Sequence, residues 1–356
     1  MTGTRADWSK MQPIARGIVK SGAFACLDIL STGMHEDGQH GNTGNDIEGS
    51  VQGVRQYHRR PNHLQGSDPV NAGIETMKII ADLTREHGYT DIFIHGDRIE
   101  ANYSSLVALS LNMRIHHIEG GEITGSVDNA LRYSVSAHAH FHYVCNEEAK
   151  NRLIRCGNNP ATIFVIGSPE MDRHAQTGER SLEEIKRHHK ISYDKYGIAS
   201  LHPVTTVDPT VTLEEALYFF FALRASGKSW IVIKPNNDPN SEQILLALEK
   251  VLEEDQKSAQ PQFFVTDNIP FDDFSTLQAN AAFAAGNSSA MNMDAVINIK
   301  AFIPDLIVHT IKVKWDKKFE RDTTFGTGKA EETFTQILAA PGYLDRDVQK
   351  RFFFSI

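Results

Sequence analysis

The chain has 356 residues, which is enough for two domains of ordinary size, each with its own hydrophobic core. Hydrophobic residues make up 40% and charged residues 23% of the sequence, as is typical of soluble globular proteins. The formal net charge of −9 argues against a nucleic-acid-binding surface, and no apolar run approaches the roughly 20 residues that a membrane-spanning helix needs.

The cysteines and the amino terminus indicate a cytoplasmic protein. Cys26, Cys145 and Cys156 are odd in number and lack zinc-binding spacing, so we interpret them as reduced thiols. The first residues also lack the charged, apolar and small-residue pattern of a secretory signal. We therefore expect neither a nucleic acid nor a membrane as a partner.

The amino-terminal part of the chain alternates predicted helices and strands. A turn at residues 3–7 precedes a predicted helix over 12–20, and residues 24–30 form an apolar run typical of a strand. Residues 31–71 are polar and rich in Gly, His and Asn, which predicts a loop-rich segment. Apolar residues return with helical spacing over 74–86.

Two strands predicted next are each followed by a carboxylate. Asp97 follows the apolar run 91–95, and Glu119 follows the run 115–118. Groups just past the carboxyl ends of parallel strands face the ligand crevice of an open sheet, so we expect both carboxylates there. Asp128 comes shortly after them, and Arg132 lies one helical turn further on, where it can orient Asp128.

These carboxylates also have ordinary structural interpretations. The Asp128–Arg132 pair by itself is typical of a helix surface, and Asp97 by itself is typical of a turn or a helix cap. Three carboxylates gathered at one crevice are nevertheless costly unless something bound there needs them. Their grouping therefore indicates a functional site.

The rest of the chain continues the alternation of strands and helices. The predicted strands cover residues 162–167, 197–201, 230–233, 263–266, 281–285 and 296–299. The predicted helices cover residues 146–156, 212–225, 240–254 and 271–279. Residues 170–195 are polar and charged, which favours a connection between domains, so the pattern predicts an α/β fold of two doubly wound domains.

Short motifs in a fixed order resemble those of the hydrolysing UDP-N-acetylglucosamine 2-epimerases, the enzymes that open sialic acid synthesis. The motifs occupy residues 3–7, 32–35, 41–43, 95–142, 167–169, 202–206, 235–238, 286–289 and 349–352. The resemblance implies the glycosyltransferase-B architecture, in which two Rossmann-like domains face a cleft. It implies a first domain over 1–175 with the catalytic carboxylates, a nucleotide-binding domain over 190–340, and a C-terminal helix at 341–356 that crosses back.

The resemblance also implies a reaction. A base removes the C2 proton of UDP-N-acetylglucosamine while UDP leaves from C1, and this anti-elimination gives a glycal. Water then adds and a proton returns to the other face of C2, so the products are N-acetylmannosamine and UDP. No cofactor is expected, and the partner is the UDP-sugar. We also expect a homo-oligomer, a dimer or a tetramer, in which the apolar helix 106–111 lies either at an interface or in its own domain core.

The family motifs assign roles to particular residues of this chain. Asp97, Glu119 and Asp128 match the catalytic carboxylates, without a choice of base or acid, and His202 matches the histidine that faces the leaving group. Glu122 is expected beside the site. The implied substrate-binding residues are Arg5, Arg98, Arg132, Asn236, Ser288, Ser289 and Asp294. Guanidinium groups and small-residue turns of this kind suit a diphosphate.

The sequence departs from the family pattern in two places. Relatives have an apolar strand ahead of the turn at 3–7, so we expect either a truncated chain or a sheet that closes differently. Within residues 290–301, Met291, Met293 and Asp294 replace the family's Gly, Arg and Glu, and a loop is missing. The nucleotide pocket of the second domain is therefore the part most changed.

Other functions stay open at this stage. One is the same reaction on a UDP-2,4-diacetamido-trideoxyhexose, and another is a nucleotide-sugar-binding relative with little turnover. A glycosyltransferase of the same architecture is the third, although it does not need the three carboxylates. His138, His140 and His142 would share one face if they lay on a strand, but no carboxylate or thiolate repeats in phase with them. We therefore expect no metal site there, nor at 116–117 or 188–189.

Overall fold

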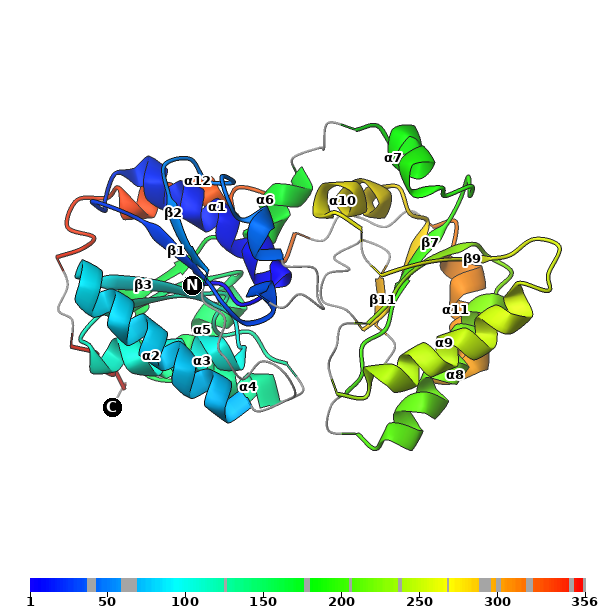
Figure 1. Cartoon of the computed structure of the whole chain (residues 1–356), viewed down its shortest axis with the longest axis horizontal. Coiled ribbons are helices and arrows are strands. Elements are labelled where there is room, and N and C mark those ends of the chain that lie inside the picture. Colours follow the sequence, from blue (N-terminus) through cyan, green and yellow to red (C-terminus); the bar gives the residue numbers. More distant parts are fainter. Residues whose placement is uncertain are drawn as a thin grey trace. The chain divides into compact units, whose positions relative to one another are not determined.

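The computed structural model describes most of the chain as two compact units. The described residues are 1–36, 43–58, 69–124, 127–175, 180–204, 207–235, 239–267, 269–287, 296–298, 302–317, 323–345 and 349–354. The first unit combines Met1–Gln176 with Thr323–Ile356, and the second is Thr177–Asp322 (Figure 1). The chain thus returns to the first unit at Thr323, whereas the family resemblance implies a return at 341.

The first unit is built on parallel strands. Its strands are β1 (Asp28–Ser31), β2 (Arg55–His58), β3 (Asp91–His95), β4 (Arg114–Ile118), β5 (Phe141–Val144) and β6 (Ile163–Val165). Among the described residues, β1 pairs with β2, and a separate sheet has the order β3-β4-β5-β6, with every pairing parallel. The carboxyl ends of β3 to β6 consequently lie along one edge of that sheet.

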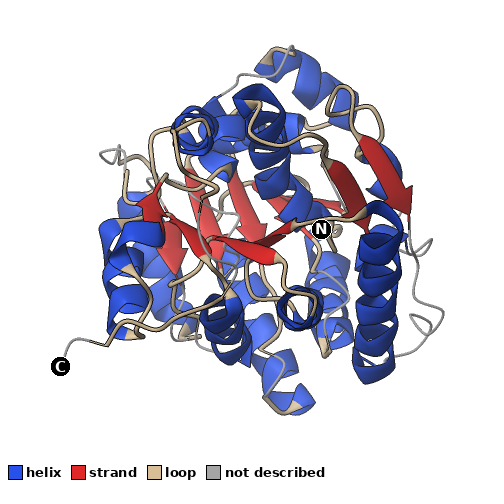
Figure 2. Ribbon diagram, turned by 90° about the vertical axis from the view of Figure 1, so that its left-hand side faces the viewer, coloured by secondary structure: helices blue, strands red, loops and turns tan. Residues whose placement is uncertain are grey.

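Helices cover these strands on both faces, as Figure 2 shows from the side. The helices are α1 (Arg5–Ser21), α2 (Pro69–His87), α3 (Ile99–Ser110), α4 (Val127–His138), α5 (Glu147–Arg155), α6 (Glu170–Ala175) and α12 (Ala330–Leu338). The aromatic side chains of Trp8, Phe93, Phe141 and Phe334 are buried in one shared core cluster. Burial of such large apolar side chains is the main favourable contribution to folding.

The helix that crosses back to the first unit is α12, which corrects the expected helix at 341–356. Asp172 caps its start, since Oδ1 accepts from Ala330 N at 2.8 Å and Oδ2 accepts from Glu331 N at 2.6 Å. Over the described part of 341–356 the chain forms turns and extended segments, with Gly342 at a φ of 73°. A left-handed residue of this kind ends helical geometry.

The second unit contains a parallel sheet with Rossmann strand order. Its strands are β7 (Gly197–Ser200), β8 (Trp230–Ile233), β9 (Phe263–Thr266), β10 (Phe283–Gly286) and β11 (Val296–Asn298). Its helices are α7 (Leu182–His189), α8 (Pro209–Ala225), α9 (Ser241–Asp255), α10 (Phe271–Ala279) and α11 (Pro304–Lys314). The order β9-β8-β7-β10-β11 is the doubly wound order 3-2-1-4-5, which reverses direction between β7 and β10.

These two units agree with the predicted α/β fold class. The expected connection at 170–195 is not wholly irregular, because α6 and α7 form within it. No helix among the described residues is both long and apolar enough to span a membrane.

Candidate active site

Polar side chains gather where the strands of the β3–β6 sheet end. Asp97 comes two residues after β3, Glu119 follows β4 directly, and Ser168 stands shortly after β6. The backbone joins the first two of these ends, since Gly96 N donates to Ile118 O at 3.0 Å. This edge is where open α/β sheets bind ligands, so the sheet brings Asp97 and Glu119 to one place, as the sequence predicts.

Glu119 is at the centre of this group. Its Oε2 lies 3.0 Å from Lys10 Nζ and 3.1 Å from His95 Nε2, and its Oε1 accepts from Ser168 Oγ at 2.5 Å. The residue is only 8% exposed, so water contributes little to holding its charge. Its backbone has a φ of 59°, the left-handed region that a side chain rarely adopts. The fold therefore fixes the direction of this carboxylate, although the backbone conformation is unfavourable.

The charges around Glu119 keep it ionised. Burial by itself would raise its pKa, but the Lys10 ammonium and the His95 ring hold the pKa of Glu119 well below its usual value. Lys10 is partly buried, and although burial opposes this, its two carboxylate neighbours, Glu119 and Glu170 at 3.7 Å, raise its pKa. A carboxylate and an ammonium are thus held side by side with little access to water.

A chain of hydrogen bonds connects this pair to the start of α1. His95 Nδ1 lies 3.0 Å from Asp7 Oδ1, while Asp7 Oδ2 accepts from the backbone amides of Gly3 at 3.2 Å and Thr4 at 3.1 Å. Against the effect of burial, the two carboxylates raise the pKa of His95 to about 9. Hydrogen bonding from His95, also against burial, lowers the pKa of Asp7 to about 2. His95 is therefore a cation at neutral pH.

The remaining predicted residues of this unit lie on neighbouring helices. Arg132 of α4 forms an ion pair with Asp97, and Asp128 is half-buried in the first turn of the same helix. Arg98 occupies the N-cap position of α3, and its Nε lies 3.3 Å from Glu100, whereas Arg5 is exposed as the first residue of α1. The amino-terminal ends of α1 and α3 therefore each carry a guanidinium group in the first unit.

Glu122 differs from Glu119 in its environment. Burial raises the pKa of Glu122, although Arg152 lies 3.7 Å from its Oε2 and Asn146 donates to its Oε1 at 3.1 Å. The nearby Glu119 carboxylate raises that pKa further. Two carboxyl groups with opposite shifts in pKa are typical of an acid and base pair.

His202 lies in the second unit, just past β7. Its backbone N–H donates to Asn287 Oδ1 at 2.8 Å, and Asn287 Nδ2 donates to its carbonyl oxygen at 2.8 Å. Because Asn287 follows β10, this pair spans the point where the strand order reverses, which is where Rossmann sheets bind nucleotides. The predicted Asn236, Ser288, Ser289 and Asp294, with Met291 and Met293, lie outside the described residues.

Sequence reasoning missed Lys10, His95, Asp7 and Ser168. A signal existed for Asp7 and Lys10, because Thr4 and Asp7 form a capping box and Lys10 follows Asp7 at the three-residue spacing of one helix face. No local pattern connects His95 or Ser168 with Glu119. Their contact depends on the parallel pairing of β3 to β6.

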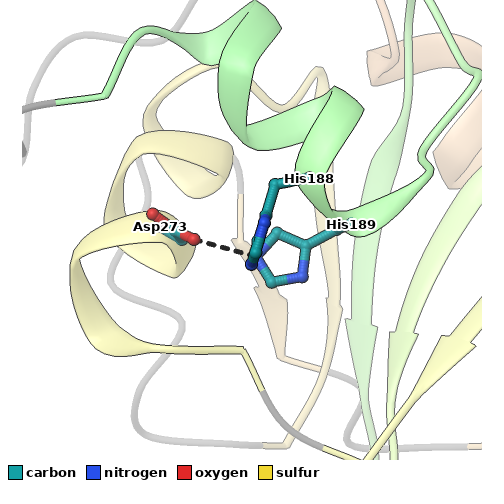
Figure 3. Close-up of side chains that lie close together, drawn as sticks. All are labelled: His188, His189 and Asp273. Carbon is teal, nitrogen blue, oxygen red and sulfur yellow. Dashed lines mark hydrogen bonds and ion pairs between the residues drawn. The ribbon is translucent and has the colours of Figure 1, made fainter.

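The structure shows where the histidines at 138–142 and 188–189 lie. Helix α4 ends at His138 and β5 begins at Phe141, so of the three alternating histidines β5 contains only His142. In the described residues, one cluster brings metal-binding atoms together: His188 and His189 of α7 with Asp273 of α10 (Figure 3). Asp273 Oδ2 already lies 2.8 Å from His189 Nε2 and 3.0 Å from Arg180 Nη1. We therefore interpret the cluster as an ion-pair group.

Comparison with known proteins identifies relatives over nearly the whole chain. A family model described as UDP-N-acetylglucosamine 2-epimerase matches residues 20–304. A UDP-N-acetylglucosamine 2-epimerase of Neisseria meningitidis serogroup B is 32% identical over 378 residues, which cover 99% of this chain and 97% of that protein. A UDP-N,N'-diacetylbacillosamine 2-epimerase (hydrolyzing) of Legionella pneumophila is 27% identical, with 83% of this chain and 77% of that protein covered.

Solved structures share the fold. The crystal structure of the Neisseria meningitidis UDP-GlcNAc 2-epimerase bound to UDP-GlcNAc matches with a TM-score of 0.73 at 15% identity, covering 94% of this chain and 97% of that one. This likeness confirms the expected fold class, an α/β fold of the glycosyltransferase-B kind.

Proposed function

Because this chain belongs to the UDP-N-acetylglucosamine 2-epimerase family, we propose that it is a hydrolysing enzyme that converts UDP-N-acetylglucosamine and water to N-acetylmannosamine and UDP. The observation that carries the proposal is the group around Glu119, which follows β4 and contacts His95 at the end of β3 and Lys10 of α1. The product would enter sialic acid synthesis, and the enzyme would act in the cytoplasm.

The proposed reaction has two steps. In the first, a carboxylate takes the C2 proton, the C1–O bond to UDP breaks, and the electron pair forms the C1–C2 double bond of a glycal. In the second, the oxygen of water bonds to C1 while a proton adds to the opposite face of C2. The first step needs a base, and the departing diphosphate needs cations.

We assign the chemistry to Asp97, Glu119 and Asp128, with His202 at the leaving group. The low pKa of Glu119 makes it hard to protonate, which suits a group that stays charged and organises its neighbours. The raised pKa of Glu122 suits a carboxyl that gives a proton in the second step. Asp97, paired with Arg132, and Asp128 are then the candidates for the base at C2.

We assign residues of each unit to the binding of the UDP group. In the first unit these are Arg5, Arg98 and Arg132, whose guanidinium groups suit the diphosphate. In the second unit we assign donors to Asn236, Ser288 and Ser289, and we assign Asp294 as an acceptor for the ribose hydroxyl groups. The binding of UDP-GlcNAc named for the Neisseria meningitidis crystal structure supports this assignment by relationship.

Product identification tests the proposal. The chain is incubated with UDP-N-acetylglucosamine in D₂O and followed by ¹H NMR. Free N-acetylmannosamine with deuterium at C2, together with an equal amount of UDP, is the expected result. Intact UDP-N-acetylmannosamine would show a non-hydrolysing epimerase instead, and sugar linked to an added acceptor would show a transferase. UDP-sugar binding without turnover would leave only a binding protein.

The names of two relatives support a second candidate substrate. The Legionella pneumophila protein and one of Campylobacter jejuni, at 24% identity, are both named hydrolyzing 2-epimerases of N,N'-diacetylbacillosamine nucleotides. The same carboxylates could act on UDP-2,4-diacetamido-trideoxyhexose, because the reacting C1 and C2 are alike in both sugars. Measuring kcat/KM for both substrates side by side decides between them, and a tenfold preference identifies the better one.

A further inference from the structure

The turn after β6 and the start of α6 are buried although they contain several polar residues. Every residue of 166–172 is buried, and Ser168, Glu170 and Asp172 are among them. A buried polar group costs free energy unless it has a hydrogen-bond or ionic partner, so each of these three needs one. Their partners lie in two different parts of the first unit. We call residues 166–172 the bridge segment.

One set of contacts connects the bridge segment to the candidate active site. Ser168 Oγ donates a hydrogen bond to Glu119 Oε1 at 2.5 Å. Glu170 holds the neighbouring cation, because its Oε2 lies 3.7 Å from Lys10 Nζ and its Oε1 accepts from Ser9 Oγ at 3.3 Å. The bridge segment therefore contacts Glu119 directly and also contacts the ammonium group that pairs with it.

The second set of contacts connects the bridge segment to residues 323–329, which lead from the second unit back to α12 and which we call the return segment. Phe325 O accepts a hydrogen bond from Ser168 N at 2.7 Å. The backbones of Gly326 and Gly167 also meet, since a Cβ on Gly326 would lie 3.0 Å from Gly167 Cα. Both glycines are left-handed, with φ of 107° and 83°. This close approach requires two residues without side chains.

The far end of the bridge segment is attached to the same part of the chain. Asp172 accepts hydrogen bonds from the first two amides of α12, and a Cβ on Gly328 would lie 3.1 Å from Met171 O. Helix α6 correspondingly lies beside both α1 and α12 (Figure 1). The return segment is thus packed against the bridge segment at both ends. Close-packed backbones of this kind transmit a displacement instead of absorbing it.

We propose that the return segment is a positioning element of the candidate active site, in which Phe325 and Gly326 fix the carboxylate of Glu119 through Ser168. The Phe325 carbonyl and the Gly326 backbone determine where the Ser168 backbone lies, and the Ser168 hydroxyl in turn directs one oxygen of Glu119. A contact that only stabilised the fold would leave the environment of Glu119 unchanged. The consequence for turnover rests on the proposed function, whereas the contact with Glu119 does not.

Gly326→Ala tests the proposal in the full chain, because its methyl group fits beside Gly167 only if the turn moves. We expect kcat to fall about tenfold while KM changes less than about twofold, which is the effect of losing one hydrogen bond to a charged group. Ser168→Ala should cause a similar loss. The double variant should also lose about tenfold instead of about a hundredfold, because both changes remove the same interaction.

A ¹³C NMR spectrum of protein labelled at the glutamate Cδ provides a second measurement that needs no turnover. The Glu119 resonance is assigned with Glu119→Gln, and it should move in the same direction in Ser168→Ala and Gly326→Ala. Gly342→Ala is the matched control. Gly342 is also left-handed, with a φ of 73°, but a Cβ there would make only an ordinary contact, 3.5 Å from Asp345 Oδ2. This control should keep both kcat and the Glu119 resonance of the wild type.

Gly167→Ala disturbs the same contact from the other side, and it takes the place of Gly326→Ala if that variant does not fold. An unmoved Glu119 resonance in the folded glycine variant, or a loss of about a hundredfold in the double variant, would overturn the proposal. A wild type without turnover would overturn the proposed function alone, because the Glu119 resonance would still decide whether the return segment positions this carboxylate.

Discussion

At the scale of single residues, the backbone of Glu119 shows how strongly the fold specifies the candidate site. A left-handed φ costs a residue with a side chain roughly 1–2 kcal/mol. The cost is offset by three side-chain contacts, and the next residues are Gly120 and Gly121, the latter also left-handed with a φ of 80°. A Cβ on Gly121 would come within 2.5 Å of Ala149 O, so the turn fits closely against α5. Strain kept in this way is typical of functional sites.

The proposed catalytic carboxylates can be tested one at a time. Asp97→Asn and Asp128→Asn are each expected to lower kcat at least about a hundredfold, the usual effect of removing an acid or base. Glu119→Gln is expected to lower kcat as much, because it removes the charge that organises Lys10 and His95. The exchanges are isosteric, so circular dichroism should be unchanged. Asp82→Asn, at an exposed carboxylate of α2, is the matched control and should keep full activity. Near-normal kcat in two of the three site variants would contradict the assignment.

His95 should make the stability of the first unit depend on pH. Its folded pKa of about 9 lies above the ordinary value of about 6.5, so its stabilising effect is complete below pH 6.5 and disappears as the pH rises through 9. The free energy of unfolding should fall over that window by up to about 3 kcal/mol.

The Met1 amine has a lowered pKa, so its contribution to the free energy of unfolding changes with pH in the opposite direction. The contribution of His95 is therefore measured as the difference between the wild type and His95→Gln. Urea unfolding at a series of pH values should show that this variant loses most of the fall. His309→Gln, at an exposed histidine of α11, should behave like the wild type. An unchanged pH dependence in His95→Gln would show that His95 titrates normally.

At the scale of elements, α1 links folding to the candidate site. Its capping box uses Thr4 Oγ1, which accepts from Asp7 N at 3.1 Å, and the same Asp7 contacts His95. Two turns along, Arg16 pairs with Glu331 of α12 at 2.8 Å. One helix therefore positions the hydrogen-bond chain toward Glu119 and connects it to the returning segment.

Thr4→Ala should therefore affect stability and activity together. Loss of the cap is expected to cost about 1 kcal/mol in the unfolding of the first unit, and a less fixed Asp7 should lower kcat. Ser181→Ala removes the matching capping box of α7 in the second unit and should leave kcat unchanged. Thermal unfolding measures the loss of stability in both variants, and steady-state kinetics measure kcat. Thr4→Ser keeps the capping hydroxyl and should restore both. Equal effects of the two alanine variants on kcat would refute a specific role for α1.

At the scale of the whole molecule, α3 has the exposed surface that the expected dimer would use. The helix buries Val107 and Ala108 inside the first unit, while Leu106 remains 41% exposed. The expected helix 106–111 thus packs one face against the core of its own unit. The side chain of Leu106 is exposed and could lie at an interface. Isolated exposed leucines are common, so association has to be measured.

We predict a dimer that depends on α3. Light scattering at micromolar concentration should give a mass near twice 39.7 kDa for the wild type. Leu106→Glu should shift it toward the monomer, because a buried unpaired carboxylate opposes association. Leu246→Glu, at a leucine of α9 that is 39% exposed, should leave the mass unchanged. A monomeric wild type would reject the prediction.

Local patterns in the sequence determined most of the elements. The predicted strands 230–233 and 263–266 and the helix 271–279 agree with β8, β9 and α10 residue for residue, because the strands are short apolar runs and the helix has apolar residues at helical spacing. The segments that the pattern missed have weaker signals: β2 is polar and at most half-buried, and α7 is a short, charged helix. The positions of Asp97 and Glu119 near strand ends could be predicted for the same reason, since Glu119 directly follows an apolar run and Asp97 comes two residues after one.

The tertiary structure alone decided which groups surround those carboxylates. Lys10, His95 and Ser168 reach Glu119 from α1, β3 and the turn after β6, and no sequence period connects them. Strand order likewise depends on pairing between distant segments, so local patterns could not predict it. The sequence by itself determined the elements and the positions of the carboxylates, because local hydrophobic periods specify both. Long-range pairing of strands decided the charge state and the partners of these carboxylates, because both depend on which elements become neighbours.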